Sequence, residues 1–201
     1  MTQVSNMPKQ NKKRWLSFAP LFIFAVLCVF LLKGLFSDPS ERESALINKS
    51  VPDFSLPDLY DESTIHTRQT LIGKPLIINV WGTWCTTCKY ELPYLTKLRN
   101  EYEVDIVGVY YDQNHAPAFG EYADVNEIRD DVRNMLAQLG NPYQYNILDL
   151  DRTLSLNLGI SGAPESFVVD ANGVIRLHHM GDINERVWRD KIAPVWNEVA
   201  R

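Results

Sequence analysis

Beyond about residue 75, the apolar residues of the chain form short continuous runs, and segments with apolar residues at helical spacing separate these runs. Two runs, Leu76 to Trp81 and Asp105 to Tyr111, are rich in β-branched and aromatic residues and have the length of buried parallel strands. Parallel strands need a crossover connection, and residues 87 to 100 between the runs predict a helix there. This part of the chain therefore predicts a β-α-β unit.

Further elements follow toward the carboxyl end. Residues 125 to 139 carry apolar side chains at helical spacing, and a short strand is expected near 145 to 148. Segments 166 to 170 and 174 to 179 flank an Asn-Gly turn and predict a hairpin, after which Asn184 can cap a final helix. The order predicts an α/β fold, a mixed sheet flanked by helices on both faces.

The amino-terminal part has a different pattern. No charged residue occurs from Trp15 to Leu32, a stretch of about 27 Å as a helix against a hydrocarbon core of about 30 Å. Lys33 can snorkel, so the stretch can extend to Phe36, and basic residues precede it. These features predict a basic cytoplasmic flank at 1–14 and one N-terminal transmembrane signal-anchor helix at 15–36, with the remainder outside the cytoplasm.

A cleaved signal peptide is the alternative to an anchor. Its apolar region is usually shorter, about 7 to 15 residues, and ends at a small-x-small site that residues 35–38 do not supply. Cys28 lies within the apolar stretch, where a thiol packs as a small apolar side chain. Residues 37–50 are polar and predict a tether, so the folded domain is expected at 51–201.

Charge narrows the choice of partners. The five basic residues before position 38 have no acidic neighbours, which leaves 15 basic and 25 acidic residues, a net charge of −10, in the rest of the chain. Nucleic-acid binding needs a clustered basic face, so nucleic acid is not expected as a partner.

The candidate chemistry is a pair of cysteines, Cys85 and Cys88, where the strand ending near Trp81 turns into a helix. Two intervening residues at a helix start bring both sulfurs within disulfide reach, and the free N–H groups there favour a thiolate. We expect Cys85 to be the nucleophile and Cys88, turned under the first helical turn, to be the resolving thiol.

Other uses of two cysteines fit less well. A structural zinc site needs about four ligands, and the sequence has no second cysteine pair. A copper-delivery protein of this fold would normally space its cysteines further apart and add a histidine ligand. The histidines at 66, 115, 178 and 179 share no ligand spacing with the cysteines, so neither a metal nor a cofactor is expected.

Three motifs carry a family resemblance. The segments 81–93 (WGTWCTTCKYELP), 159–167 (GISGAPESF) and 181–188 (GDINERVW) resemble the CcmG/DsbE family of thiol:disulfide interchange proteins. The resemblance implies a thioredoxin-like fold with a cis-Pro164 beside the cysteines; on its own, an Ala-Pro bond before a strand is expected to be trans. It also implies a redox-active Cys85–Cys88 disulfide.

The family's function gives the expected role. Members are anchored in the bacterial inner membrane with the domain in the periplasm. They keep the haem-binding cysteines of apocytochrome c reduced during cytochrome c maturation, and a membrane thiol reductant such as DsbD reduces them again. A general extracytoplasmic thiol:disulfide oxidoreductase with another substrate stays the nearest alternative.

The expected site residues beyond the cysteines are Glu91 and Glu165, which occupy positions where the family has acids, and we expect them to tune the cysteine pKa. Without the family pattern, both would be expected to be solvated surface carboxylates. We expect Trp84 to form a lid on the sulfurs. Thr86 stands where the family usually has proline, so the family's redox potential cannot be transferred. The segment 112–127 is enlarged relative to the family pattern, and two interpretations stay open: it alters the choice of partner, or it is a neutral surface insertion.

Overall fold

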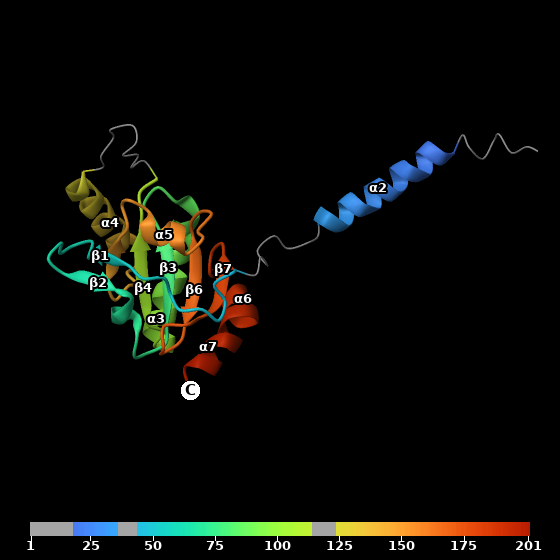
Figure 1. Ribbon diagram of the computed structural model, residues 1–201. Coiled ribbons are helices and arrows are strands. Elements are labelled where there is room, and N and C mark those ends of the chain that lie inside the picture. Colours follow the sequence, from blue (N-terminus) through green and yellow to red (C-terminus); the bar gives the residue numbers. More distant parts are fainter. Residues whose placement is uncertain (1–17, 36–43, 114–123) are drawn as a thin grey trace, which may run out of the picture. The chain divides into compact units, whose positions relative to one another are not determined.

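The structure is a computed structural model that describes residues 18–35, 44–113 and 124–201 (Figure 1). The chain divides into two units, residues 1–41 and 42–201. The predicted basic flank at 1–14 and residues 37–43 of the predicted tether lie outside the described residues.

The first unit contains the helix α2 (Ala19–Leu35), whose large apolar side chains are exposed; Phe22 and Phe30 are 72% and 74% exposed. Within the part of the chain that is described, no helix is both long and apolar enough to cross a membrane.

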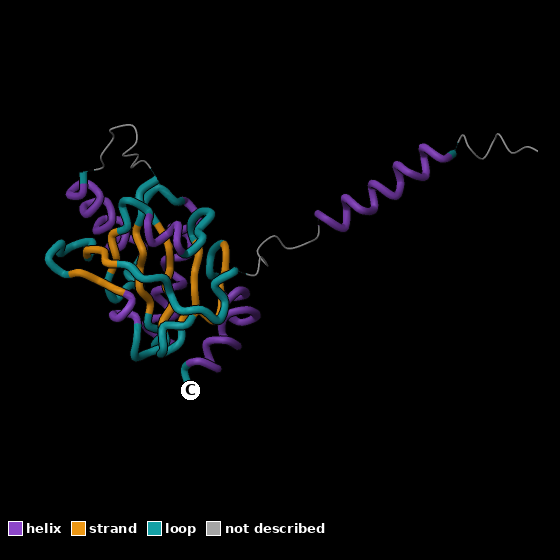
Figure 2. Tube along the Cα trace, viewed as in Figure 1, coloured by secondary structure: helices purple, strands orange, loops and turns teal. Residues whose placement is uncertain are grey.

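The second unit is built on a five-stranded sheet with the strand order β5-β4-β3-β6-β7 (Figures 1 and 2). β3 runs parallel to β4, and β4 parallel to β5, whereas β6 pairs antiparallel with both β3 and β7. The strands are β3 (Leu76–Trp81), β4 (Ile106–Tyr110), β5 (Asn146–Leu148), β6 (Glu165–Val169) and β7 (Ile175–Met180). The predicted thioredoxin-like mixed sheet is confirmed.

Helices cover both faces of this sheet, as predicted. On one face, apolar side chains of α3 (Thr86–Tyr102), α4 (Val125–Leu139) and the C-terminal helices share a core cluster with Trp81 of β3. On the other face, α5 (Thr153–Asn157) and a 3-10 helix (Arg68–Leu71) pack on a second cluster. Both clusters bury alternate positions of the same strands, which is why β3, β4 and β6 have no solvent-exposed face.

The C-terminal helix begins where the sequence predicts. The Asn184 side chain caps α6 (Glu185–Val187) by accepting a hydrogen bond from the Val187 N–H at 3.1 Å. A π-helical segment (Trp188–Ile192) then leads into α7 (Ala193–Val199). Pro194 lacks an N–H, so regular α-helical pairing cannot run through this point.

Some elements were not predicted. The strands β1 (Ser55–Pro57) and β2 (Ile65–Thr67) form a small separate hairpin, and α5 is a single short helix. Residues 44–50 pair with the hairpin of β6 and β7: the Asn48 N–H donates to the Ile175 carbonyl at 2.8 Å. The chain is therefore already attached to the sheet before Val51.

Candidate active site at the start of helix α3

Cys85 and Cys88 form a disulfide across the first turn of α3, with their Cα atoms 5.3 Å apart. Cys85 is the N-cap residue, and its sulfur accepts a hydrogen bond from the Cys88 N–H at 3.0 Å. Cys85 is 4% exposed and Cys88 is fully buried. A donor aimed at the Cys85 sulfur favours its thiolate when the disulfide is reduced, and the burial of Cys88 agrees with an inner, resolving sulfur.

The segment between β3 and α3 is held against the end of β4. The Trp84 indole N–H donates to the Tyr111 carbonyl at 3.0 Å, and the two rings meet edge to face. Gly82 makes this possible, because a Cβ there would lie 2.3 Å from Trp84 Nε1. Trp84 is thus fixed beside the cysteines, and its role as a lid stays a prediction.

The loop before β6 lies against the outer sulfur. The Ala163–Pro164 peptide bond is cis, and the Ala163 carbonyl oxygen is 3.3 Å from Cys85 Sγ. The Pro164 carbonyl accepts from the Gly181 N–H at 2.9 Å, which joins this loop to the end of β7. Cys85, Cys88 and Pro164 are therefore brought together, as the resemblance implies.

Glu165 is buried and surrounded by donors. Its Oε1 accepts from the Ser161 N–H at 2.8 Å, the Ser161 hydroxyl at 2.7 Å and the Gly162 N–H at 3.0 Å. His178 Nε2 lies 2.7 Å from its Oε2. Burial alone raises the pKa of this carboxyl, but the hydrogen bonds from His178, Ser161 and Gly162 outweigh it and lower the pKa. Glu165 is therefore an ionised carboxylate.

Glu91 is also buried, but it has fewer donors. Asn79 Nδ2 donates to its Oε1 at 2.9 Å, and the Ile183 N–H donates to its Oε2 at 3.0 Å. Burial raises the pKa of Glu91 to about 7. The two hydrogen bonds lower the pKa but do not offset burial, and the nearby charge of Asp182 raises it further. Near neutral pH this carboxyl can gain or lose a proton.

A buried polar network lies behind Glu91. Asn79 Nδ2 also donates to the Ser166 hydroxyl at 3.0 Å, and the Tyr143 hydroxyl donates to Asn79 Oδ1 at 2.7 Å. Neither Asn79 nor Tyr143 was predicted from the sequence to have a role. The available signal was Asn79 itself, a polar residue inside an apolar strand, because a buried amide needs partners.

The oxygens of the two predicted acids are engaged by partners other than the cysteines. In the described part of the chain, neither Glu91 nor Glu165 hydrogen-bonds to a cysteine sulfur. Glu91 is one helical turn beyond Cys88 on α3, and Glu165 follows Pro164 directly. Any effect of these acids on the sulfurs therefore acts through space or through the backbone that they hold.

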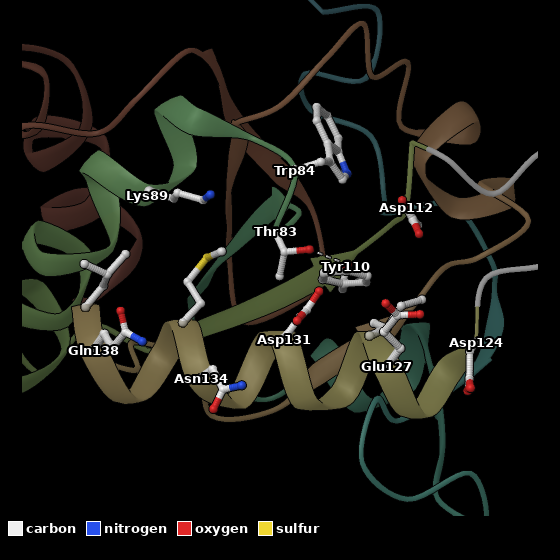
Figure 3. A pocket seen from close by; sticks show the side chains of 13 residues that line it. Thr83, Trp84, Lys89, Tyr110, Asp112, Asp124, Glu127, Asp131, Asn134 and Gln138 are labelled. Carbon is white, nitrogen blue, oxygen red and sulfur yellow. Dashed lines mark hydrogen bonds between the residues drawn. The ribbon is translucent and has the colours of Figure 1, made fainter.

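A groove with a volume of about 710 Å³ lies beside Trp84, between the start of α3 and the helix α4 (Figure 3). Figure 3 shows Lys89 on the α3 side and acids on the other, and the groove is lined in part by Asp112, Asp124, Glu127 and Asp131. The enlarged segment 112–127 borders this groove, but its residues 114–123 lie outside the described residues.

Comparisons with known proteins agree with this site. The Redoxin family model matches residues 46–192. The thiol:disulfide interchange protein DsbE of Pseudomonas fluorescens biotype C is 44% identical over 181 residues, covering 90% of this chain and 93% of its own. DsbE of Pseudomonas aeruginosa is 41% identical over 187 residues, covering 93% and 96%.

A solved structure shares the fold. The secreted disulfide oxidoreductase of Mycobacterium tuberculosis superposes with a TM-score of 0.53 at 19% identity, covering 70% of this chain and 95% of its own. Together with the disulfide at the start of α3, the two DsbE relatives assign the activity, thiol:disulfide exchange through Cys85 and Cys88. The chain belongs to the Redoxin family and, within it, to the DsbE thiol:disulfide interchange proteins.

Proposed function

We propose that this protein is a periplasmic, membrane-anchored protein-disulfide reductase that keeps the haem-binding cysteines of apocytochrome c reduced during cytochrome c maturation. The single observation that carries the proposal is the disulfide of Cys85 and Cys88 at the start of α3, beside cis-Pro164, in a chain 44% identical to a DsbE protein. The family resemblance supplies the substrate.

The reaction runs from the reduced enzyme. The Cys85 thiolate attacks one sulfur of the substrate disulfide, and the other substrate sulfur leaves as a thiolate and takes up a proton. Cys88 then loses its proton and attacks Cys85 Sγ, which releases the second substrate sulfur as a thiol. The substrate gains two electrons and two protons, and the enzyme is left as the Cys85–Cys88 disulfide seen in the structure.

Glu91 supports this cycle as a titrating group under the site. Its carboxyl is buried one turn from Cys88 and has a pKa of about 7, so it changes charge near neutral pH. A carboxylate there disfavours a nearby thiolate, whereas a neutral carboxyl does not. In the proposal Glu91 thereby tunes the pKa of the cysteines, and Glu165 acts mainly through the loop that it holds.

The membrane anchor is part of the proposal. Its support is the uncharged stretch from Trp15 to Leu32, the basic residues before it and the exposed apolar side chains of α2. In the proposal, electrons reach Cys85 and Cys88 from a membrane thiol reductant such as DsbD, which restores the dithiol after each turnover.

Trapping of the mixed disulfide tests the function. We expect Cys88→Ser to accumulate a covalent complex with an apocytochrome c that carries an oxidised haem-binding motif, because the second attack is missing. Cys85→Ser should form none. The complexes would be identified on non-reducing gels and by mass spectrometry after expression with the cytochrome.

The same experiment separates the alternatives. A Cys88→Ser variant that traps many unrelated periplasmic proteins and no apocytochrome would show a general oxidoreductase instead. Trapping by Cys85→Ser in place of Cys88→Ser would reverse the roles of the two sulfurs.

A further inference from the structure

His178 of β7 lies outside the disulfide and outside every motif used so far, yet it is joined to the active-site loop. Its side chain is 7% exposed, and its Nε2 is 2.7 Å from Glu165 Oε2. The ring is stacked on Phe167, its register partner on β6, with ring centres 4.2 Å apart. Stacking and pairing leave this imidazole little freedom to move.

Three donors from Ser161 and Gly162 converge on Glu165 Oε1, an arrangement that stabilises an ionised carboxylate. An ionised carboxylate can only accept, so His178 Nε2 carries the hydrogen and donates. The other oxygen of Glu165 accepts from Ser161 and Gly162 at 2.7 to 3.0 Å. One carboxylate therefore connects a fixed ring on the sheet to the loop that precedes Pro164.

Packing holds the two ends of this loop but not its middle: Ile160 and Ala163 pack against the core. A Cβ added at Gly159 or at Gly162 would have no neighbouring atom within 4 Å. A hollow of about 360 Å³ also borders Ser161 and His178. Between these packed ends, Ser161 and Gly162 are held by their hydrogen bonds to Glu165.

The loop position matters for the reaction because Ala163 O is 3.3 Å from Cys85 Sγ. A polypeptide joined to Cys85 must lie along the groups that surround this sulfur. A small dithiol can reach the sulfur without contacting those surrounding groups. A shift of the loop would therefore affect polypeptide substrates more than small ones.

We propose that His178 is a positioning residue for polypeptide substrates: by holding the Glu165 carboxylate it fixes the loop 161–163 against Cys85. The residue acts through Glu165 and the loop and does not touch the reacting sulfurs. This inference rests on the thiol:disulfide exchange activity and holds whichever protein is the substrate.

The kinetic test compares two reductants of the oxidised full-length protein in detergent. One is a synthetic peptide with two thiols separated by two residues, and the other is dithiothreitol. In His178→Leu, which keeps an apolar contact with Phe167 but has no donor, we expect the KM for the peptide to rise about tenfold, equivalent to about 1.4 kcal/mol, with kcat unchanged. The rate with dithiothreitol should change less than about twofold.

Two further variants serve as rescue and control. His178→Gln places an amide donor near the position of Nε2 and should restore the peptide KM to within about twofold of wild type. His179→Leu is the matched control: His179 is the next residue of β7, is also buried, and interacts with the Asp182 carbonyl at 3.3 Å instead of with Glu165. It should leave the peptide KM unchanged.

Amide hydrogen exchange gives a direct readout of the loop. The Ser161 and Gly162 N–H groups should exchange about tenfold faster in His178→Leu and at the wild-type rate in His178→Gln. Equal loss of rate with peptide and dithiothreitol, a normal peptide KM in His178→Leu, or failure of glutamine to rescue would each overturn the proposal. If His178→Leu does not fold, the exchange rates and peptide KM of His178→Gln decide: wild-type values support the donor role, and altered values overturn it.

Discussion

The two glutamates near the cysteine pair have opposite pKa shifts although both are nearly inaccessible to solvent, at 1% exposure for Glu91 and 2% for Glu165. Glu91 lies deeper inside the protein, so desolvation acts more strongly on it, and Glu165 has more donors. Glu165 accepts from Ser161, Gly162 and His178, which lowers its pKa despite burial. Among the described residues, Glu91 accepts from Asn79 and the Ile183 N–H, and burial prevails and raises its pKa to about 7.

The raised pKa of Glu91 makes stability depend on pH. Because the folded protein holds this proton up to about pH 7 and the unfolded chain releases it near 4.5, the folded state binds more protons in between. The contribution of Glu91 to the free energy of unfolding is therefore fully present below about pH 4.5 and is lost as pH rises toward 7. The loss is about 3 kcal/mol at most. We expect Glu91→Gln to remove this slope.

Urea unfolding of the oxidised protein at pH 5 and pH 7.5 measures the effect. Glu101→Gln, an exposed change on the same helix, is the control and should keep the wild-type slope. An identical loss of stability between the two pH values in wild type and Glu91→Gln would refute the titration of Glu91.

At the residue scale, the sequence predicted which side chains react but not which groups hydrogen-bond to the glutamates beside them. The spacing of Cys85 and Cys88 was enough to predict a redox pair, because two residues at a helix start determine the geometry. The partners of Glu91 and Glu165 come from β3, β7 and two loops, so no local pattern contained them. His178 was noted only as a histidine without ligand spacing, since its pairing with Glu165 depends on the register of β6 and β7.

At the scale of elements, the strand-to-helix connection after β3 organises the site. The sequence predicted β3, β4, α3 and α4 to within one or two residues because their apolar runs and helical periods are long. It missed β1, β2 and α5, which have three to five residues each and are held by tertiary contacts. Elements this short contain too few residues to show a hydrophobic repeat in the sequence.

Gly82 is the residue on which this connection depends. A Cβ at this position would lie 2.3 Å from Trp84 Nε1 and 2.8 Å from the Tyr111 carbonyl, the two groups that hydrogen-bond to each other. We expect Gly82→Ala to displace the Trp84 indole and to destabilise the protein by about 1 to 3 kcal/mol.

Chemical denaturation and tryptophan fluorescence measure this change. Gly162→Ala is the matched control for stability, because a Cβ there meets no atom within 4 Å. A Gly82→Ala variant as stable as wild type, with unchanged fluorescence, would show that the close approach at Trp84 is not required.

At the scale of the whole molecule, charge and hydropathy divide the chain. Five basic residues and the apolar stretch precede position 38, and the remainder carries a net charge of −10. The two structural units, residues 1–41 and 42–201, follow the same division. This arrangement agrees with the proposed anchor and exported domain.

Protease treatment of spheroplasts tests that topology. We expect added protease to remove the domain from intact spheroplasts, because the basic flank retains the amino terminus in the cytoplasm. A cytoplasmic marker protein, which should survive, controls for lysis. Protection of the domain until the cells are lysed would place it on the cytoplasmic side.

A protein-disulfide reductase requires that Cys85 and Cys88 form a reducing couple. Their equilibrium with glutathione measures the redox potential of this couple most directly. The Cys88 N–H favours a Cys85 thiolate, and Glu91, when ionised, opposes one. Stabilising the thiolate stabilises the dithiol, so the opposing acid shifts the potential toward that of thioredoxin, about −270 mV, and away from that of the strong oxidant DsbA, about −120 mV. We predict a value nearer to −270 mV for the purified protein at pH 7, and a value near −120 mV would contradict the proposed reductase.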